Sequence, residues 1–195
     1  MKKNKSWYGF HFRIPYKKNK PVKSWVDIYI IDVLFRQILY IHKERINLWR
    51  FHRRWNDDKT GHQLTLFCYI NERGAKGIDT IIKNSKALKL IKTNRNLKRY
   101  FYKNYGNNIE STCDKKWVNE IQQTWPYFIN GMSEMILRMI QLVKENTVRE
   151  IDDDVESFYI RVNKRLIKIW RKEGRHAFFH HISALFGYDP ILMTF

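Results

Sequence analysis

Residues 46–70, INLWRFHRRWNDDKTGHQLTLFCYI, contain two runs of alternating apolar and polar side chains around a turn sequence. The runs, 46–55 and 62–70, are rich in aromatic and β-branched residues, which is typical of strands. The asparagine, aspartates and glycine between them favour a turn. The stretch therefore predicts an antiparallel hairpin with a long loop, and it sets the fold class of the first half of the chain.

Two further strands and two helices surround this hairpin in the sequence. Residues 6–14 alternate as a strand, and residues 97–104 predict a fourth strand. Residues 24–42 are apolar on most sides and lack Gly and Pro, which predicts a buried helix whose first serine is the N-cap. Residues 75–91 show helical spacing with a break near Asn84–Ser85. The order βαββαβ predicts a four-stranded, largely antiparallel, ferredoxin-like sheet with two helices on one face.

The second half of the chain shows only helical periodicity. Pro126 follows Thr124 and predicts the first turn of a helix, where a missing N–H is tolerated. Another long helix is expected from Val155, with Gly174 ending or bending it. A long helical section therefore follows the sheet.

The chain has enough apolar mass for one packed domain. Hydrophobic residues make up 44% of the 195 residues and aromatic residues 15%, which excludes a largely disordered chain. We therefore predict a single α+β domain over residues 1–195, with an α+β part over 1–105 and a helical part over 115–190.

The charge of the chain is strongly unbalanced. There are 37 Lys and Arg against 19 Asp and Glu, a net charge of +18, which indicates an anionic partner such as nucleic acid, an anionic membrane face or an acidic peptide. Cys68 and Cys113 have neither a disulfide framework nor zinc spacing, and reduced thiols fit a cytoplasmic protein. The most apolar stretch, 25–41, contains two aspartates and an arginine, so no membrane span is expected.

The candidate site residues of the hairpin divide between the two faces of the predicted sheet. Strand alternation places three on one face, Arg50, His52 and Arg54, and three on the other, Phe51, Arg53 and Trp55. One face thus carries a row of cationic groups that could hold a carboxylate or a phosphate, and His62 opens the next strand. The alternative is a solvated edge of a basic protein.

Three histidines lie close together near the end of the chain, His176, His180 and His181. A spacing of four places the first two on one helical face, a spacing that zinc ligands also use. The HExxH glutamate and a third ligand are absent, so no metal is predicted, and an acid–base role competes with plain packing or exposure. The acidic run 152–154 predicts helix capping. No glycine-rich phosphate loop is present, and no cofactor is predicted.

Three separated pieces of the sequence occur in an order that is typical of one family. SWYGFHFRI at 6–14 is a tryptophan-led strand. FHRRWNDDKTGH matches a strand, turn and histidine motif at Phe51, Arg53, Asp57 and His62, and HHISALFGYD matches a histidine-led motif at His180, Leu185 and Gly187. Together they resemble the carboxy-terminal domain of class I lantibiotic dehydratases, which also occurs free-standing in thiopeptide-type bacteriocin biosynthesis. The chain departs from this family at HQLTL, which lacks two family arginines, and at Ser183–Ala184, where the family has Asn-Arg.

The resemblance implies a peptide-modifying enzyme of lyase type, acting in dehydroamino-acid chemistry on a leader-bearing precursor peptide. It would eliminate glutamate from glutamylated serine or threonine, or join two dehydroalanines by a formal [4+2] cycloaddition, and it would need a separate glutamylating partner protein. His180 would act as base or acid and Arg53 would stabilise negative charge. We expect these two residues to converge on one pocket, with His62 and Arg54 nearby and with Arg50 and His52 also binding substrate.

Two other functions remain open from the sequence. A nucleic-acid-binding protein needs only the positive charge and aromatic residues among basic ones, as in Tyr100, Phe101 and Tyr102 between Arg99 and Lys103. No RNA- or DNA-binding signature supports this function. A non-catalytic peptide-binding subunit would explain the missing family arginines.

Overall fold

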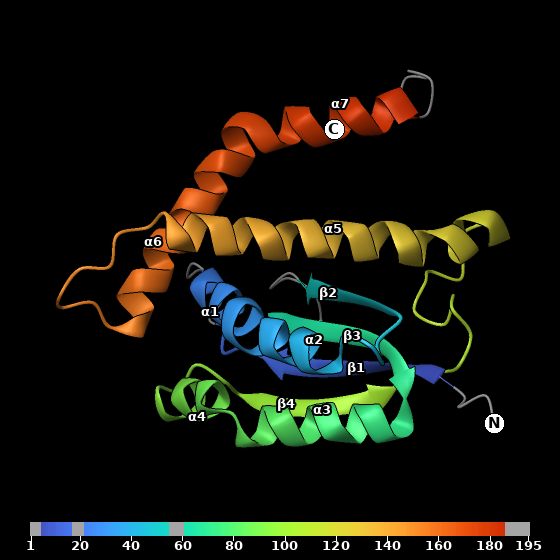
Figure 1. Ribbon diagram of the computed structural model, residues 1–195, viewed down its shortest axis with the longest axis horizontal. Helices are drawn as coiled ribbons and strands as arrows, with labels where there is room; N and C mark the ends of the chain where they lie inside the picture. Colours follow the sequence, from blue (N-terminus) through green and yellow to red (C-terminus); the bar gives the residue numbers. More distant parts are fainter. Residues whose placement is uncertain (1–4, 17–21, 55–60, 186–195) are drawn as a thin grey trace.

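The computed structural model describes residues 5–16, 22–54 and 61–185. Its first half contains β1 (Lys5–Arg13), α1 (Ser24–Tyr29), a π-helical segment η1 (Ile30–Phe35), α2 (Arg36–His42), β2 (Leu48–Arg54), β3 (Gln63–Asn71), α3 (Glu72–Asn84), α4 (Lys86–Thr93) and β4 (Arg99–Asn104). Its second half contains α5 (Asn119–Glu145), α6 (Val155–Ile169), a second π-helical segment η2 (Trp170–Gly174) and α7 (Arg175–Leu185). Figure 1 shows the sheet with α5 above it and α7 beyond α5.

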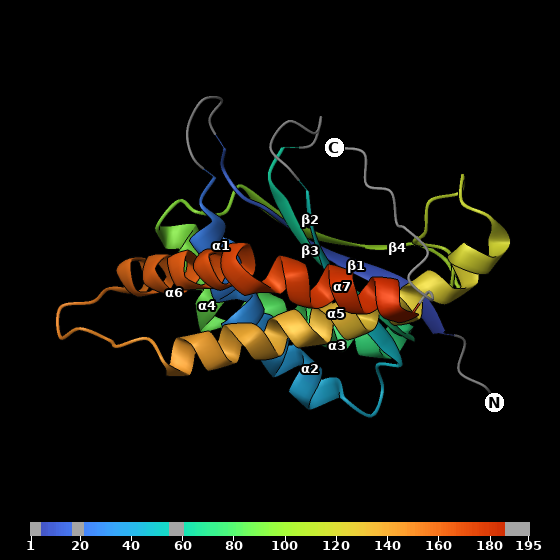
Figure 2. The same ribbon diagram turned by 90° about the horizontal axis from the view of Figure 1, so that it is seen from above.

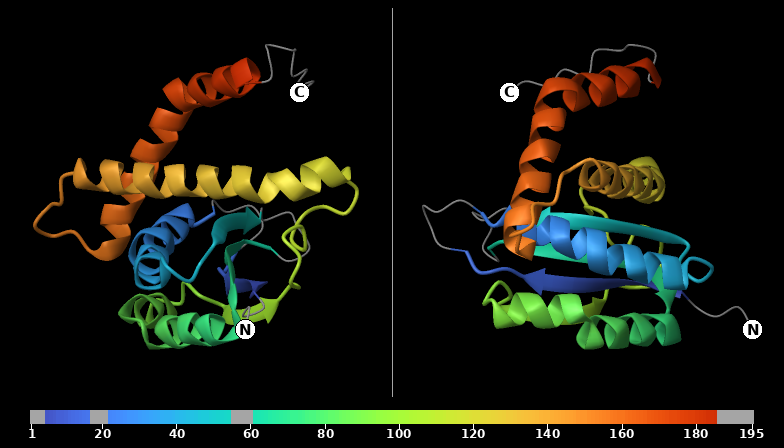
Figure 3. Two further views of the ribbon diagram at one scale, coloured as in Figure 1. Left: turned by 45° about the vertical axis from the view of Figure 1, so that its right-hand side comes forward. Right: turned by 60° about the vertical axis from the view of Figure 1, so that its left-hand side comes forward.

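The four strands form one sheet in the order β2-β3-β1-β4, and each neighbouring pair is antiparallel. The helices from α1 to α4 cover one face of this sheet, and α5 runs over its β2 edge (Figures 1 and 3). The predicted α+β fold, with an antiparallel four-stranded sheet followed by helices, is confirmed. The ferredoxin-like assignment stays a prediction.

The strand alternation read from the sequence decides which side chains enter the core. Phe10 and Phe12 of β1 and Leu64 and Leu66 of β3 are fully buried under the helices. The strands differ from their predicted bounds by one or two residues, and the predicted loop at 56–60 lies outside the described residues.

The long buried helix predicted at 24–42 is present, but it is not purely α-helical. The segment η1 interrupts it with π geometry between α1 and α2. The helix begins at Ser24, and Lys23 occupies the cap position without a side-chain hydrogen bond, so the predicted serine cap is wrong by one residue. The predicted break in the other helix is confirmed, because the Ser85 hydroxyl accepts a hydrogen bond from Leu88 N (3.0 Å) and caps α4.

The outer edge of β2, which pairs with no further strand in the described part of the chain, is covered by polar side chains of α5. Asn130 Oδ1 accepts a hydrogen bond from Trp49 N (2.7 Å), and Ser133 Oγ accepts one from Phe51 N (3.4 Å). Edge strands otherwise present such N–H groups to other chains. Within the described residues, no helix, including α5, is long and apolar enough to cross a membrane.

The prediction that Pro126 starts a helix is wrong. The helix α5 begins at Asn119, so Pro126 lies in its interior, where it cannot donate to the carbonyl of Gln122. The thiol of Cys113 donates to that carbonyl (3.3 Å). A side chain from the preceding loop therefore replaces the missing backbone hydrogen bond, and Pro126 does not have to end the helix.

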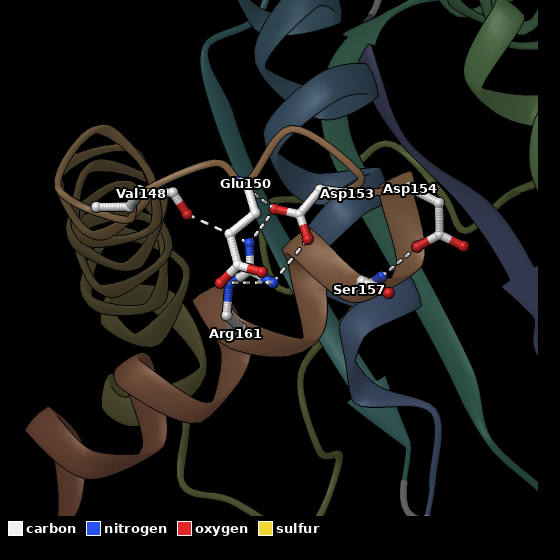
Figure 4. A network of polar contacts seen from close by, with 6 residues as sticks. All are labelled: Val148, Glu150, Asp153, Asp154, Ser157 and Arg161. Carbon is white, nitrogen blue, oxygen red and sulfur yellow. Dashed lines mark hydrogen bonds and ion pairs between the residues drawn. The ribbon is translucent and has the colours of Figure 1, made fainter.

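The helix cap predicted for the acidic run 152–154 is provided by its last residue. Asp154 caps the helix by accepting a hydrogen bond from Ser157 N (2.7 Å). Figure 4 shows that the neighbouring Asp153 pairs with Arg161, which lies two turns further along the helix. This ion pair holds the loop before α6 against the first two turns of the helix.

One buried carboxylate ties α5 and α6 to the long N-terminal helix. Asp32 of η1 is 1% exposed, and its Oδ2 accepts hydrogen bonds from Lys144 Nζ (2.7 Å) and from the Tyr159 hydroxyl (2.6 Å). Arg36 lies 3.2 Å from its Oδ1. The charge that argued against a membrane span is therefore a structural anchor between three helices.

Candidate functional site

Three of the predicted cationic residues, Arg50, His52 and Arg54 of β2, line one cavity of about 530 Å³. The cavity lies on the sheet face opposite to the helices α1–α4, and residues of β1, β3, the loop after β4 and the start of α5 complete its wall. These further residues are His11, Gln63, Thr65, Phe67, Tyr105, Ser111, Thr112, Cys113, Asp114, Trp117 and Trp125. The predicted separation of these three residues from Phe51 and Arg53 agrees with their placement, and Trp55 lies outside the described residues.

Arg50 is the buried cation of this cavity. Its guanidinium lies over two rings, with Cζ 4.2 Å from the centroid of Phe67 and 4.9 Å from that of Trp125. It is 5% exposed, and burial lowers the pKa of its guanidinium to about 10, so it remains charged at neutral pH. Among the described residues no carboxylate lies within ion-pair distance of Arg50. Its protein acceptor is the Thr112 carbonyl, at 3.3 Å from Nη2.

Two buried polar atoms of the cavity wall have no hydrogen-bond partner among the described residues, Arg50 Nε and Thr112 Oγ1. Buried polar groups in native proteins are almost always hydrogen-bonded, and an unpaired one destabilises the fold by about 1–3 kcal/mol. Arg50 Nε and Thr112 Oγ1 therefore remain as donors for a ligand, and a guanidinium pairs well with a planar or tetrahedral anion.

A histidine and a tyrosine form a second polar group in the wall. Gln63 Nε2, which can only donate, lies 3.1 Å from His11 Nδ1, so the neutral ring carries its proton on Nε2. That nitrogen lies 3.0 Å from the Tyr105 oxygen and donates to it, so the Tyr105 hydroxyl hydrogen is available to the cavity. Burial, together with the nearby Arg54, Arg13 and Lys103, lowers the pKa of His11 to about 4. Burial also raises the pKa of Tyr105, which keeps its hydroxyl protonated as a donor.

The rings of His11, Tyr105 and Phe67 can converge because residue 9 is glycine. A Cβ atom at Gly9 would lie 2.8 Å from Tyr105 Cε2 and 2.9 Å from both His11 Nε2 and Phe67 Cε1. Such distances are too short for any side chain. The alternation at 6–14 predicted only a strand, although a glycine within a strand signals a close approach of this kind.

Arg53 and His62 lie on the other face of the sheet, where they meet a buried carboxylate. His62 Nε2 donates to Asp27 Oδ2 (2.9 Å), and Arg53 Nε lies 3.5 Å from the same oxygen. Both Asp27 and His62 are buried. Asp27 was not predicted as a site residue, although an aspartate in an apolar helix signals a buried polar partner.

His180 does not lie near Arg53 or the cavity. It is exposed on α7, where its ring stacks on His176 with the centroids 5.3 Å apart and contacts His181 at 5.4 Å. Figures 1 and 3 show α5 between α7 and the sheet, and Figure 2 shows α7 extending away from η2 along the direction of α5. The expected convergence of Arg53 and His180 is therefore not found. The physical reason is the bend at η2 and Gly174, which directs α7 outward.

The remaining sequence-based site predictions have the following outcomes. Asp57 and Gly187, which carry part of the family resemblance, lie outside the described residues. Within the described ranges, no group of three or more His, Cys, Asp or Glu side chains is arranged to hold a metal ion. Cys68 and Cys113 are both free thiols. The chain matches no protein-family model, no curated protein and no solved structure.

Proposed function

We propose that the Arg50 cavity binds the carboxylate of a modified peptide, and that the protein acts in dehydroamino-acid chemistry by eliminating glutamate from glutamylated serine or threonine. The observation that supports this proposal best is Arg50 itself, a buried cation that contacts aromatic rings and a carbonyl and has no carboxylate within ion-pair distance among the described residues. A buried charge without a counterion is costly, and an anionic ligand would compensate it.

The chemistry of elimination fits the donors of this cavity. A base removes the α-proton, and the electron pair of the broken Cα–H bond forms the Cα=Cβ bond. The Cβ–O bond breaks at the same time, and glutamate leaves with both of its electrons. Negative charge grows on the departing carboxylate, and fixed donors aimed at it lower the barrier. Arg50 of β2 and two residues of the loop after β4, Tyr105 and Thr112, supply such donors, and His52 adds an imidazole to the wall. A cycloaddition would use the same class of peptide but releases no comparable glutamate carboxylate.

The partners follow from the same proposal. As the family resemblance implies, a separate protein would glutamylate the substrate, in the cytoplasm. The surplus of positive charge would attract an acidic leader peptide during encounter.

Nucleic-acid binding is the second candidate function, and one surface feature favours it. Phe101 of β4 lies below the guanidinium groups of Arg13 and Arg99, at 5.5 and 5.0 Å from its ring centroid. However, His11 already stacks on that ring at 4.6 Å. Tyr100 and Tyr102 point to the other face, where Tyr100 donates to Asp79 and Tyr102 stacks on Phe10. Of the predicted aromatic series, only Phe101 therefore remains on the open face.

A synthetic peptide with O-glutamyl-threonine, followed by mass spectrometry, tests the first proposal. The wild-type protein should release glutamate and leave dehydrobutyrine. Arg50→Met should slow this by about 10²–10³-fold, the usual effect of removing one donor to a developing anion. The matched control is Arg138→Met, which removes an exposed arginine of α5 with the same change of charge. Tyr105→Phe provides a second variant that keeps the buried cation.

Four results would contradict the proposal. The wild-type protein could leave the peptide unchanged and bind it no better than the unglutamylated peptide. Arg50→Met, shown by circular dichroism to be folded, could be as active as wild type. Binding without turnover would instead identify a non-catalytic peptide-binding subunit, and tighter binding of single-stranded oligonucleotide would favour nucleic acid.

A further inference from the structure

A second concave surface lies on the helical side of the molecule, between α5 and α6. This groove has a volume of about 260 Å³, and its floor is apolar, formed mainly by Ile136, Met139, Ile140, Leu166, Ile167 and Trp170. Arg53 also lines it. Ile167 is 40% exposed although its neighbour Leu166 is buried, so the groove presents apolar surface to the outside.

A row of cations borders this groove on α6 and η2. Lys164, Lys168 and Arg171 follow one another at intervals of four and three residues, which places them on one helical face. They are exposed, and they line a shallow hollow that shares Ile167 with the groove. In the described part of the chain, no acidic side chain lies within ion-pair distance of these three cations. The next cation, Lys172, does have a partner, Glu173, at 3.5 Å.

An apolar floor beside a cationic row complements one kind of partner. An amphipathic helix presents an apolar stripe next to a charged face, and acidic residues on that face would meet the row. A nucleic acid would need open aromatic faces for its bases, but Trp170 already stacks on Phe178 with the ring centroids 5.6 Å apart. A second copy of this chain would bring another +18 of charge to the same surface.

We propose that the groove between α5 and α6 is a docking surface for an acidic amphipathic helix of a partner protein. The apolar stripe of that helix covers Ile167 and its neighbours, while its carboxylates pair with Lys164, Lys168 and Arg171. The surface lies on the opposite side of β2 from the Arg50 cavity, and the proposal does not depend on the elimination chemistry.

Fluorescence anisotropy with two labelled synthetic peptides tests this docking surface. The first is an 18-residue helix with leucines at i, i+3, i+4 and i+7 and glutamates on the flanking positions, and the second replaces the leucines by glutamines at equal charge. We expect the first peptide to bind about tenfold more tightly than the second. The charge-reversed variant Lys164→Glu/Lys168→Glu/Arg171→Glu should weaken its binding by about tenfold or more, and Ile167→Asp should remove the preference for leucine. The matched control, Lys86→Glu/Lys89→Glu/Lys92→Glu, reverses three exposed lysines of α4 and should have little effect.

The alternatives give different results in the same experiment. Equal binding of the two peptides, or equal weakening by the α4 control, means attraction by net charge alone and overturns the proposal. The proposal is also overturned if a single-stranded oligonucleotide displaces the leucine peptide and binds Ile167→Asp as tightly as the wild-type protein. Sedimentation that shows a dimer disrupted by Ile167→Asp assigns the groove to a second copy and overturns it as well.

Discussion

His11 couples the stability of the fold to pH. It is 3% exposed, and its folded-state pKa of about 4 lies well below the 6.5 of an exposed histidine. The folded protein therefore keeps the ring neutral at pH values where the unfolded chain takes up a proton. Its contribution to stability is complete above pH 6.5 and is lost as the pH falls from 6.5 to about 4.

The size of this effect follows from the two pKa values. A tenfold difference in proton affinity corresponds to about 1.4 kcal/mol, so the full contribution is about 3 kcal/mol. Between pH 7 and pH 5 the free energy of unfolding should fall by about 2 kcal/mol from this residue alone. The cause is burial, with the cations Arg54, Arg13 and Lys103 adding repulsion.

Urea unfolding followed by tryptophan fluorescence at pH 7, 6 and 5 measures this contribution. The variant His11→Gln keeps hydrogen-bonding groups at the position but cannot titrate. The difference in unfolding free energy between wild type and variant should shrink by about 2 kcal/mol from pH 7 to pH 5. Burial also lowers the pKa of His42, but that residue is present in both proteins and its effect cancels. A difference that does not change with pH would refute the reasoning.

Two further predictions concern the cavity and the helical anchor. Gly9→Ala should lower the free energy of unfolding by about 1–3 kcal/mol and weaken binding of the glutamylated peptide, because the added Cβ would force apart the rings of Tyr105, His11 and Phe67. Urea unfolding measures the first effect and fluorescence anisotropy the second, and an unchanged affinity would contradict the role given to the three rings. Tyr159→Phe should lower the free energy of unfolding by about 1.5–3 kcal/mol, the contribution of a hydrogen bond to a charged group, because it removes the donor to buried Asp32. The control Tyr127→Phe, at an exposed position of α5, should change the same free energy by less than about 0.5 kcal/mol, and equal effects of the two variants would refute the anchor.

The sheet and the division of the β2 residues between its faces could be predicted because both depend on local alternation. A period of two places Arg50 and Arg53 on opposite faces whatever packs against them. The burial of Arg50 could not be predicted in the same way. It depends on the loop after β4 and on Trp125 of α5, which lie more than 50 residues away in the chain and whose positions no local pattern determines.

The errors at Pro126 and His180 have a similar origin. Proline usually marks a helix start because its missing N–H costs nothing there, but the Cys113 thiol satisfies the orphaned carbonyl and removes that reason. For His180, the motif placed the residue correctly on a helix but carried no information about the direction of that helix. The direction depends on the π-helical segment η2, and such segments have no simple sequence pattern.

Two of the three arginines of β2, Arg50 and Arg53, show why a site residue is better recognised by whether it has a counterion than by its motif. Arg53 matches the family motif, but it lies beside Asp27, which also accepts from His62, so its charge is already balanced within the fold. Arg50 matches no motif, and it is more deeply buried, with two rings against its guanidinium and a donor atom, Nε, that has no hydrogen-bond partner in the described part of the chain. Burying a cation without a counterion lowers the stability of the fold, whereas the partner of a paired cation already offsets part of that cost. An anion entering the molecule would therefore gain more from Arg50 than from Arg53, and the Arg50 face of the sheet is where binding of such an anion should be sought first.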